Sequence, residues 1–138
     1  MIFTIFKGRH RAWPWRFGIW WKRSSLTRDI QFTESCRYDL QSDDQFDTNK
    51  LIGIGYLPGH HKESARFGWR YWTEMGEIEL SAYCYINGRR VIKHIGFCRI
   101  GKTYRLQLRL LHSAYFFICL SDEFNETIDV PYVHRKKL

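Results

Sequence analysis

Residues 77–111 read EIELSAYCYINGRRVIKHIGFCRIGKTYRLQLRLL, and this stretch decides the fold. From Glu77 to Ile86 polar and apolar residues alternate strictly, as they do in a strand that buries one face. Asn87-Gly88 follows. Asn-Gly between two alternating runs favours a type I′ turn, because both central positions of that turn need positive φ. The sequence therefore predicts an antiparallel hairpin that turns at Asn87 and Gly88.

A two-residue loop also fixes the register of this hairpin. The pairs that it predicts are Ile86–Arg89, Cys84–Val91, Ala82–Lys93, Leu80–Ile95 and Ile78–Phe97. This pairing gathers apolar residues on one face, with Lys93 as the misfit. A slip of one residue would mix the two faces, so the pattern supports the turn assignment.

A second turn is expected at Gly101-Lys102. If it is also a two-residue loop, the predicted pairs are Phe97–Leu106, Ile95–Leu108 and Lys93–Leu110. Apolar residues again meet mainly apolar residues. We therefore predict three consecutive antiparallel strands in one sheet.

The opposite face of this predicted sheet is basic and carries tyrosines. Its members are Glu77, Glu79, Tyr83, Tyr85, Arg90, Ile92, His94, Arg105, Gln107 and Arg109. His94 is expected across from Arg109. Arg66 and Arg70 join this face if their strand belongs to the same sheet. Two interpretations are open: a solvated outer face, which antiparallel sheets often have, or a rigid platform for a ligand.

Composition indicates an all-β chain. The sequence has 138 residues, which points to one domain over residues 1–138, and its aromatic content is high, with six Trp, eight Tyr and ten Phe. Aromatic and β-branched residues favour strands, and runs of helix-favouring residues are scarce. Eight to nine short strands predict an antiparallel two-sheet sandwich, jelly-roll-like, with a closed antiparallel barrel as the alternative.

The charge balance concerns partners rather than fold. With 22 Lys and Arg against 14 Asp and Glu, the net charge is +8, which favours anionic partners such as nucleic acid, nucleotides or acidic glycans. No window reaches the roughly 18 apolar residues of a membrane span, so no membrane contact is expected. The N-terminal residues lack the pattern of a signal peptide, which predicts a cytoplasmic protein.

The four cysteines are expected to be reduced thiols. Cys36, Cys84, Cys98 and Cys119 have no short spacing, so neither a zinc site nor another metal centre is expected, and no cofactor motif is present. The predicted register places Cys84 and Cys98 on opposite faces, where they cannot bridge without backbone movement, and leaves a disulfide between other pairs open.

Two further segments have unusual chemistry. His60 and His61, with Glu63 two residues on, are the candidates for general acid–base catalysis or for binding a metal. No orienting partner can be named for them, and adjacent residues on an extended chain point opposite ways, which disfavours a shared metal. The run from Trp13 to Trp21 contains four tryptophans. It is interpreted either as a stacking surface for bases or sugars, or as a strand that seals one end of the core.

Three functions are compatible with these residues. The first is a non-catalytic binding module for an anionic ligand, nucleic acid or nucleotide, on the face of Tyr83, Tyr85, Arg90, His94, Arg105 and Arg109, joined by Arg66 and Arg70. The second is a carbohydrate-binding sandwich in which aromatic side chains stack on sugars and Glu77, Glu79 and Gln107 bind hydroxyls. The third is a hydrolase or nuclease that depends on the histidines.

Overall fold

The computed structural model describes residues 4–5, 12–13, 25–55 and 63–132 of the chain. These residues form ten strands and two short 3-10 helices. The strands are β1 (Thr4–Ile5), β2 (Ala12–Trp13), β3 (Ser25–Gln31), β4 (Asn49–Gly55), β5 (Glu63–Trp72), β6 (Glu77–Ile86), β7 (Arg89–Cys98), β8 (Thr103–Leu110), β9 (Ala114–Leu120) and β10 (Asn125–Pro131), and the helices are η1 (Glu34–Cys36) and η2 (Asp43–Phe46).

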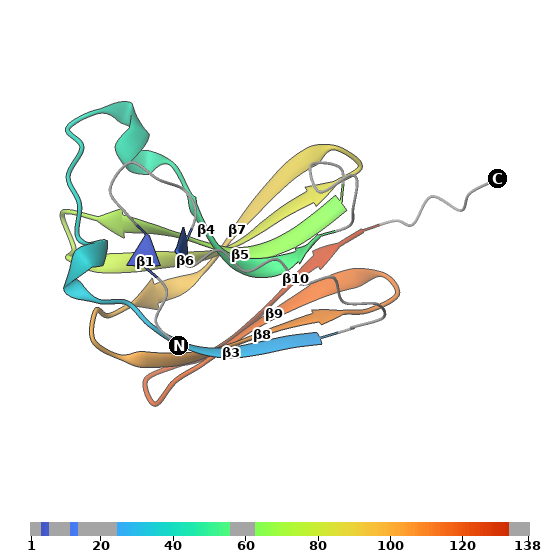
Figure 1. Cartoon of the computed structure of the whole chain (residues 1–138). Helices are drawn as coiled ribbons and strands as arrows, with labels where there is room; N and C mark the ends of the chain where they lie inside the picture. Colours follow the sequence, from blue (N-terminus) through green and yellow to red (C-terminus); the bar gives the residue numbers. More distant parts are fainter. Residues whose placement is uncertain (1–3, 6–11, 14–24, 56–62, 133–138) are drawn as a thin grey trace.

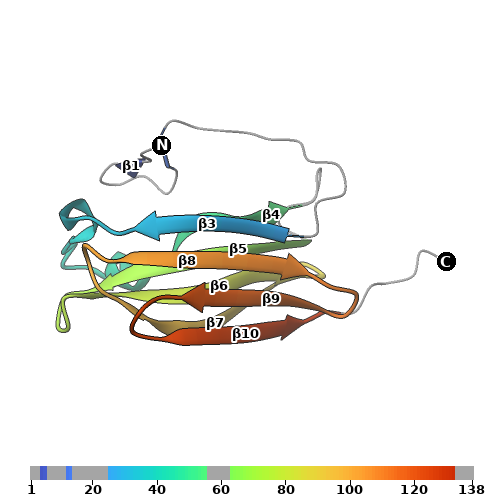
Figure 2. The same cartoon turned by 90° about the horizontal axis from the view of Figure 1, so that it is seen from below.

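Two antiparallel sheets of four strands each face one another (Figures 1 and 2). The first sheet has the order β4-β5-β6-β7 and the second has the order β10-β9-β8-β3, while β1 and β2 form a separate pair. At one edge β7 lies against β10, where Lys93 Nζ donates a hydrogen bond to the Asp129 carbonyl at 3.0 Å. The predicted antiparallel sandwich is confirmed, and the described strands do not close into a barrel.

The hairpin at Asn87 and Gly88 forms as predicted. Asn87 has φ of 52° and Gly88 has φ of 78°, so both central positions lie in the left-handed region that a type I′ turn requires. β6 and β7 pair from Ile86 opposite Arg89 to Ser81 opposite His94 in the predicted register. The misfit Lys93 lies at the sheet edge, where its ammonium reaches β10.

Beyond Ser81 a β-bulge shifts the register of β7 by one residue. Leu80 lies opposite Gly96, Glu79 opposite Phe97 and Ile78 opposite Cys98, so the predicted pairs Leu80–Ile95 and Ile78–Phe97 are wrong. A bulge inserts an unpaired residue and reverses the facing of everything after it. Ile95 stays buried, while the ring of Phe97 moves to the outer face and lies 5.1 Å from the ring of His94.

The predicted second hairpin is wrong, because β8 belongs to the second sheet. Gly101 has φ of 88° and does end a turn, but β8 pairs with β3 and β9 instead of β7. The turn therefore carries the chain from one sheet to the other. The apolar face of β8 packs against the first sheet from across the core, with Tyr104, Leu106 and Leu108 fully buried.

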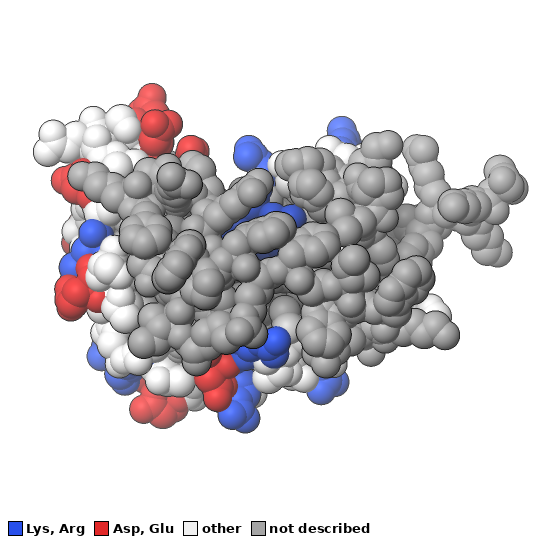
Figure 3. Space-filling model, viewed as in Figure 1, with Lys and Arg blue, Asp and Glu red and all other residues white. Residues whose placement is uncertain are grey.

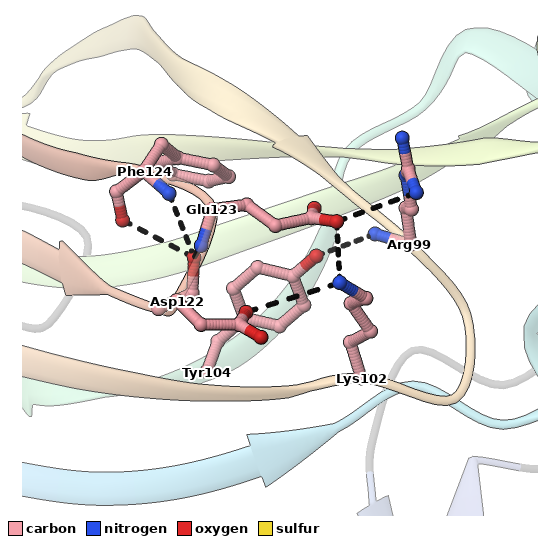
Figure 4. A network of polar contacts seen from close by, with 7 residues as sticks. Arg99, Lys102, Tyr104, Asp122, Glu123 and Phe124 are labelled. Atoms are coloured by element: carbon pink, nitrogen blue, oxygen red, sulfur yellow. Dashed lines mark hydrogen bonds and ion pairs between the residues drawn. The ribbon is translucent and has the colours of Figure 1, made fainter.

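Polar contacts hold this crossing in place (Figure 4). The Gly101 N–H donates to the Phe32 carbonyl at 2.8 Å, and the Arg99 N–H donates to the Tyr104 hydroxyl at 2.7 Å. Glu123, in the turn between β9 and β10, forms ion pairs with Lys102 and with Arg99. The crossing is thus tied to the end of β3 and to the β9–β10 turn.

The core lies between the sheets. It includes the buried side chains of Phe32, Phe67, Trp69, Ile78, Leu80, Leu106, Leu108, Phe117, Cys119 and Val130. Phe67 of β5 and Phe117 of β9 meet edge to face at a centroid distance of 5.0 Å, which joins a central strand of each sheet.

The cysteines are free thiols. Cys84 and Cys98 both belong to the core cluster with no exposed surface, so their predicted placement on opposite faces is wrong. The bulge at Ile95 is the cause, because it turns Cys98 inward.

Candidate functional site

The structure divides the eight predicted ligand-binding residues between two surfaces. Six lie on the outer face of the first sheet: Arg66, Arg70, Tyr83, Tyr85, Arg90 and His94. Arg105 and Arg109 lie on the outer face of the second sheet, because β8 crosses to that sheet. His94 consequently lies opposite Ser81 and not opposite Arg109. The prediction that all eight residues share one basic face is therefore wrong for Arg105 and Arg109.

Arg105 is already neutralised on the second sheet. Its Nε and Nη2 atoms donate to the two carboxylate oxygens of Asp29 at 2.8 and 3.2 Å, and this hydrogen bond lowers the pKa of Asp29. A hollow of about 310 Å³ beside the pair is lined by Asp29, Thr103, Arg105, Leu120 and Ser121. The carboxylate cancels the charge that an anion would need there.

On the first sheet, the Glu79 carboxylate contacts the side chains of two predicted ligand-binding residues, Arg70 and His94. Its carboxylate accepts from Arg70 Nε at 2.9 Å and lies 3.4 Å from His94 Nδ1. Arg70 also stacks on the Trp72 ring, with its Cζ atom 4.7 Å from the ring centroid. The charge of Arg70 is thus compensated by Glu79, and the Glu79 carboxylate is engaged by Arg70 and His94 instead of being open to a sugar hydroxyl.

The other half of this face carries basic side chains from three strands. Lys50 of β4, Arg66 of β5 and Arg90 of β7 surround Tyr83 and Tyr85 of β6, and we call these five residues the basic tyrosine cluster. The Tyr83 and Tyr85 hydroxyls lie 3.5 Å apart, and Lys50 Nζ lies 5.6 Å from the Tyr83 ring centroid. Among residues 25–55 and 63–132, no carboxylate forms an ion pair with Lys50, Arg66 or Arg90.

The cations of the cluster act on the two phenols. Burial raises the pKa of Tyr83, but hydrogen bonds with Tyr85 and Arg90 and the charge of Lys50 outweigh burial, so the pKa of Tyr83 lies below its ordinary value. The hydrogen bond with Tyr83 raises the pKa of Tyr85. The hydrogen bond between the two phenols thus favours ionisation of Tyr83 over ionisation of Tyr85.

The two tyrosines differ in exposure. Tyr83 is only 6% exposed, so its ring is not accessible for stacking on a base. Tyr85 and Arg66 are partly exposed and Arg90 is exposed. Tyr83 therefore serves to position its neighbours, and the accessible contacts come from Arg66, Tyr85 and Arg90.

Lys50 was missed by sequence reasoning. Counting alternately back from Gly53, which lies opposite Arg66 on the outer face, places Lys50 inward. A register shift between Lys50 and Gly53 reverses this and pairs Lys50 with Gly68 on the outer face. No local pattern in β4 marks that irregularity.

Two of the three candidates for catalysis, His60 and His61, lie outside the described residues, as does most of the Trp13–Trp21 run. The Glu63 carboxylate accepts a hydrogen bond from the Asn87 N–H at 3.0 Å, which braces the β6–β7 turn.

Within the described ranges no group of three His, Cys, Asp or Glu side chains is placed to hold a metal ion. Nor does any helix there have the length and apolar composition to cross a bilayer.

Replacing Glu79 with glutamine is expected to lower the free energy of unfolding by about 1–3 kcal/mol, because it removes the negative charge from the half-buried hydrogen bond with Arg70. Glu34→Gln is the matched control. Glu34 also pairs with an arginine, Arg37, but its side chain is 77% exposed, so the expected loss is below about 1 kcal/mol. Urea unfolding of both variants measures the difference, and equal losses would show that Glu79 has no special role.

Comparison with known proteins found no match for the chain among protein-family models, curated proteins or solved structures.

Proposed function

We propose that the chain is a non-catalytic binding module that holds an anionic ligand, a nucleic acid or a nucleotide, on the basic tyrosine cluster. The observation that carries this proposal is the placement of Lys50, Arg66 and Arg90 on three strands of one sheet face with no carboxylate paired to them in the described structure. Arg70, on the same face, has such a carboxylate in Glu79. The uncompensated charge is therefore local to one half of the sheet.

The two ends of the first sheet differ in the charges that lie beside them. Figure 3 shows acidic side chains at the left end, where η1 and η2 lie, with basic side chains among them, and further basic side chains at the upper and lower margins. Asp43 and Asp44 belong to η2, while Arg89 and Arg90 follow the hairpin turn. An approaching anion is directed to the end of the first sheet that carries the cluster.

The residue types suit phosphate. An arginine guanidinium offers a planar fork of N–H donors that matches phosphate oxygens, and its charge is retained at any physiological pH. Tyr85 adds a partly exposed hydroxyl beside Arg66 and Arg90. β5 and β6 are interior strands of the sheet, so they hold these donors at fixed spacing. The proposed site is thus preorganised for an anion.

Binding of a fluorescent single-stranded DNA oligonucleotide, followed by anisotropy, tests the proposal. If all three cations contact phosphates, the logarithm of affinity is expected to fall with the logarithm of salt with a slope of about −2. Arg66→Gln and Arg90→Gln are each expected to weaken binding about tenfold to a hundredfold, because each loses a charged hydrogen bond.

Arg28→Gln is the matched control, because it removes an exposed arginine from β3 on the other sheet. It is expected to leave affinity within about twofold, since an exposed charge on the other sheet is largely screened from the cluster. Salt-independent binding, or equal losses in all three variants, would contradict the proposal. Binding of a labelled nucleoside triphosphate, compared with binding of the oligonucleotide, distinguishes a nucleotide site from a nucleic-acid site. Displacement of the oligonucleotide by an uncharged oligosaccharide would favour the carbohydrate-binding alternative.

A further inference from the structure

The outer face of the second sheet carries an apolar row between polar residues of the two neighbouring strands. Phe116, Ile118 and Leu120 alternate with the buried residues of β9 and point away from the core. Leu120 is 38% exposed, and Phe116 and Ile118 are partly exposed. None of the described strands or 3-10 helices lies over this face. We call these three residues the β9 row.

The strands beside β9 flank this row with opposite charges. Arg109 of β8 lies on one side of Phe116 and Asp129 of β10 lies on the other. Both are exposed, and neither forms an ion pair with another described residue. Arg105, the other cation of the face, is held by Asp29.

This arrangement is complementary to itself. A two-fold axis parallel to β9 places the β9 row of one copy on the β9 row of the other, and lays β8 of each copy over β10 of its partner. Arg109 then faces Asp129 in both directions, because both residues are in register with Phe116. In the same arrangement Gln107 of one copy faces Thr127 of its partner, and Arg105 faces Asn125.

The alternative axis forms no opposite-charge pair between the copies. A two-fold axis perpendicular to the strands lays β8 over β8 and brings Arg109 towards Arg105, whose charge is already paired with Asp29. The same axis brings Asp129 towards Asn125, which carries no charge. The charges on the face therefore select one of the two symmetric arrangements.

We infer that the outer face of β8, β9 and β10 is a docking surface for a second copy of this chain, formed by the β9 row and reciprocal Arg109–Asp129 pairs. Three strands about 4.8 Å apart and seven residues long cover roughly 350 Å² per copy, against about 800 Å² for a standard stable interface. The dimer is accordingly weak and reversible. It leaves the basic tyrosine cluster on the far sheets of both copies, so it is independent of the proposed function.

Sedimentation equilibrium of the whole chain, from about 10 µM to about 1 mM, tests this inference in the range where weak dimers populate. The chain is expected to shift from monomer to dimer over this range. Arg109→Asp and Asp129→Arg are each expected to weaken dimerisation at least tenfold, because each places like charges together twice. The double variant Arg109→Asp/Asp129→Arg is expected to restore the wild-type dimer.

A second pair of variants tests the apolar contact. Ile118→Arg is expected to abolish the dimer, whereas Ile92→Arg introduces the same change at a 43% exposed position on the first sheet and is expected to leave it intact. Near-ultraviolet circular dichroism shows whether each variant is folded. If Ile118→Arg is unfolded, the variants of Arg109 and Asp129 decide the question. Three results would overturn the inference. The chain could stay monomeric up to about 1 mM, the range in which weak dimers are detected. The double variant could fail to recover dimerisation, or Ile92→Arg could weaken the dimer as much as Ile118→Arg does.

Discussion

Replacing Phe117 with alanine is expected to lower the free energy of unfolding by about 3–5 kcal/mol. Phe117 has no exposed surface and meets Phe67 of the facing sheet edge to face at 5.0 Å. The substitution removes the ring and leaves a cavity between two central strands, which close-packed sheets fill only in part. The effect is large because this contact joins the two layers.

Chemical unfolding followed by tryptophan fluorescence measures this loss. Phe46→Ala is the matched control, because Phe46 is 59% exposed and touches Trp72 only at a ring distance of 6.4 Å. Its expected cost is about 1 kcal/mol or less. A similar cost at both positions would mean that the two sheets do not pack through Phe117.

The variant Gly53→Ala is expected to destabilise the protein by about 1–3 kcal/mol or more, through the pairing of β4 with β5. A Cβ atom at residue 53 would lie 2.2 Å from the Ala65 carbonyl oxygen and 2.6 Å from the Arg66 Cα atom. These are backbone atoms of the neighbouring strand, which a side-chain rotation does not move away. β4 must therefore separate from β5 or shift along it.

Gly96→Ala is the control for a strand glycine with room to adapt. There the nearest atoms belong to the Phe124 ring at 3.3 Å, which can move by a few tenths of an ångström. We expect a change below about 1 kcal/mol at this position. Hydrogen exchange of the β4 amides should increase in Gly53→Ala and stay unchanged in Gly96→Ala, and the reverse order would contradict the close approach of the strands.

The candidate site was only partly predictable. Tyr83, Tyr85 and Arg90 were placed together correctly, because Asn87-Gly88 fixes the register next to the turn. The sequence predicts Arg66 on this face only if its strand belongs to the same sheet, and the structure pairs Arg66 with Tyr83 in that sheet. The compensation of Arg70 by Glu79 was not foreseen, since it depends on a side-chain contact between two strands whose pairing the sequence left open.

Local chemistry in the sequence determined the strands, the Asn87-Gly88 turn and the inward or outward facing of the residues near that turn. It did not determine which sheet receives β8. The alternation of Tyr104, Leu106 and Leu108 buries the same residues whether β8 extends the first sheet or faces it from across the core, so both arrangements satisfy one hydrophobic pattern. Only the tertiary structure decides between them, because the choice rests on contacts between distant segments: β8 finds its partners in β3 and β9, and Glu123 holds the crossing at Arg99 and Lys102.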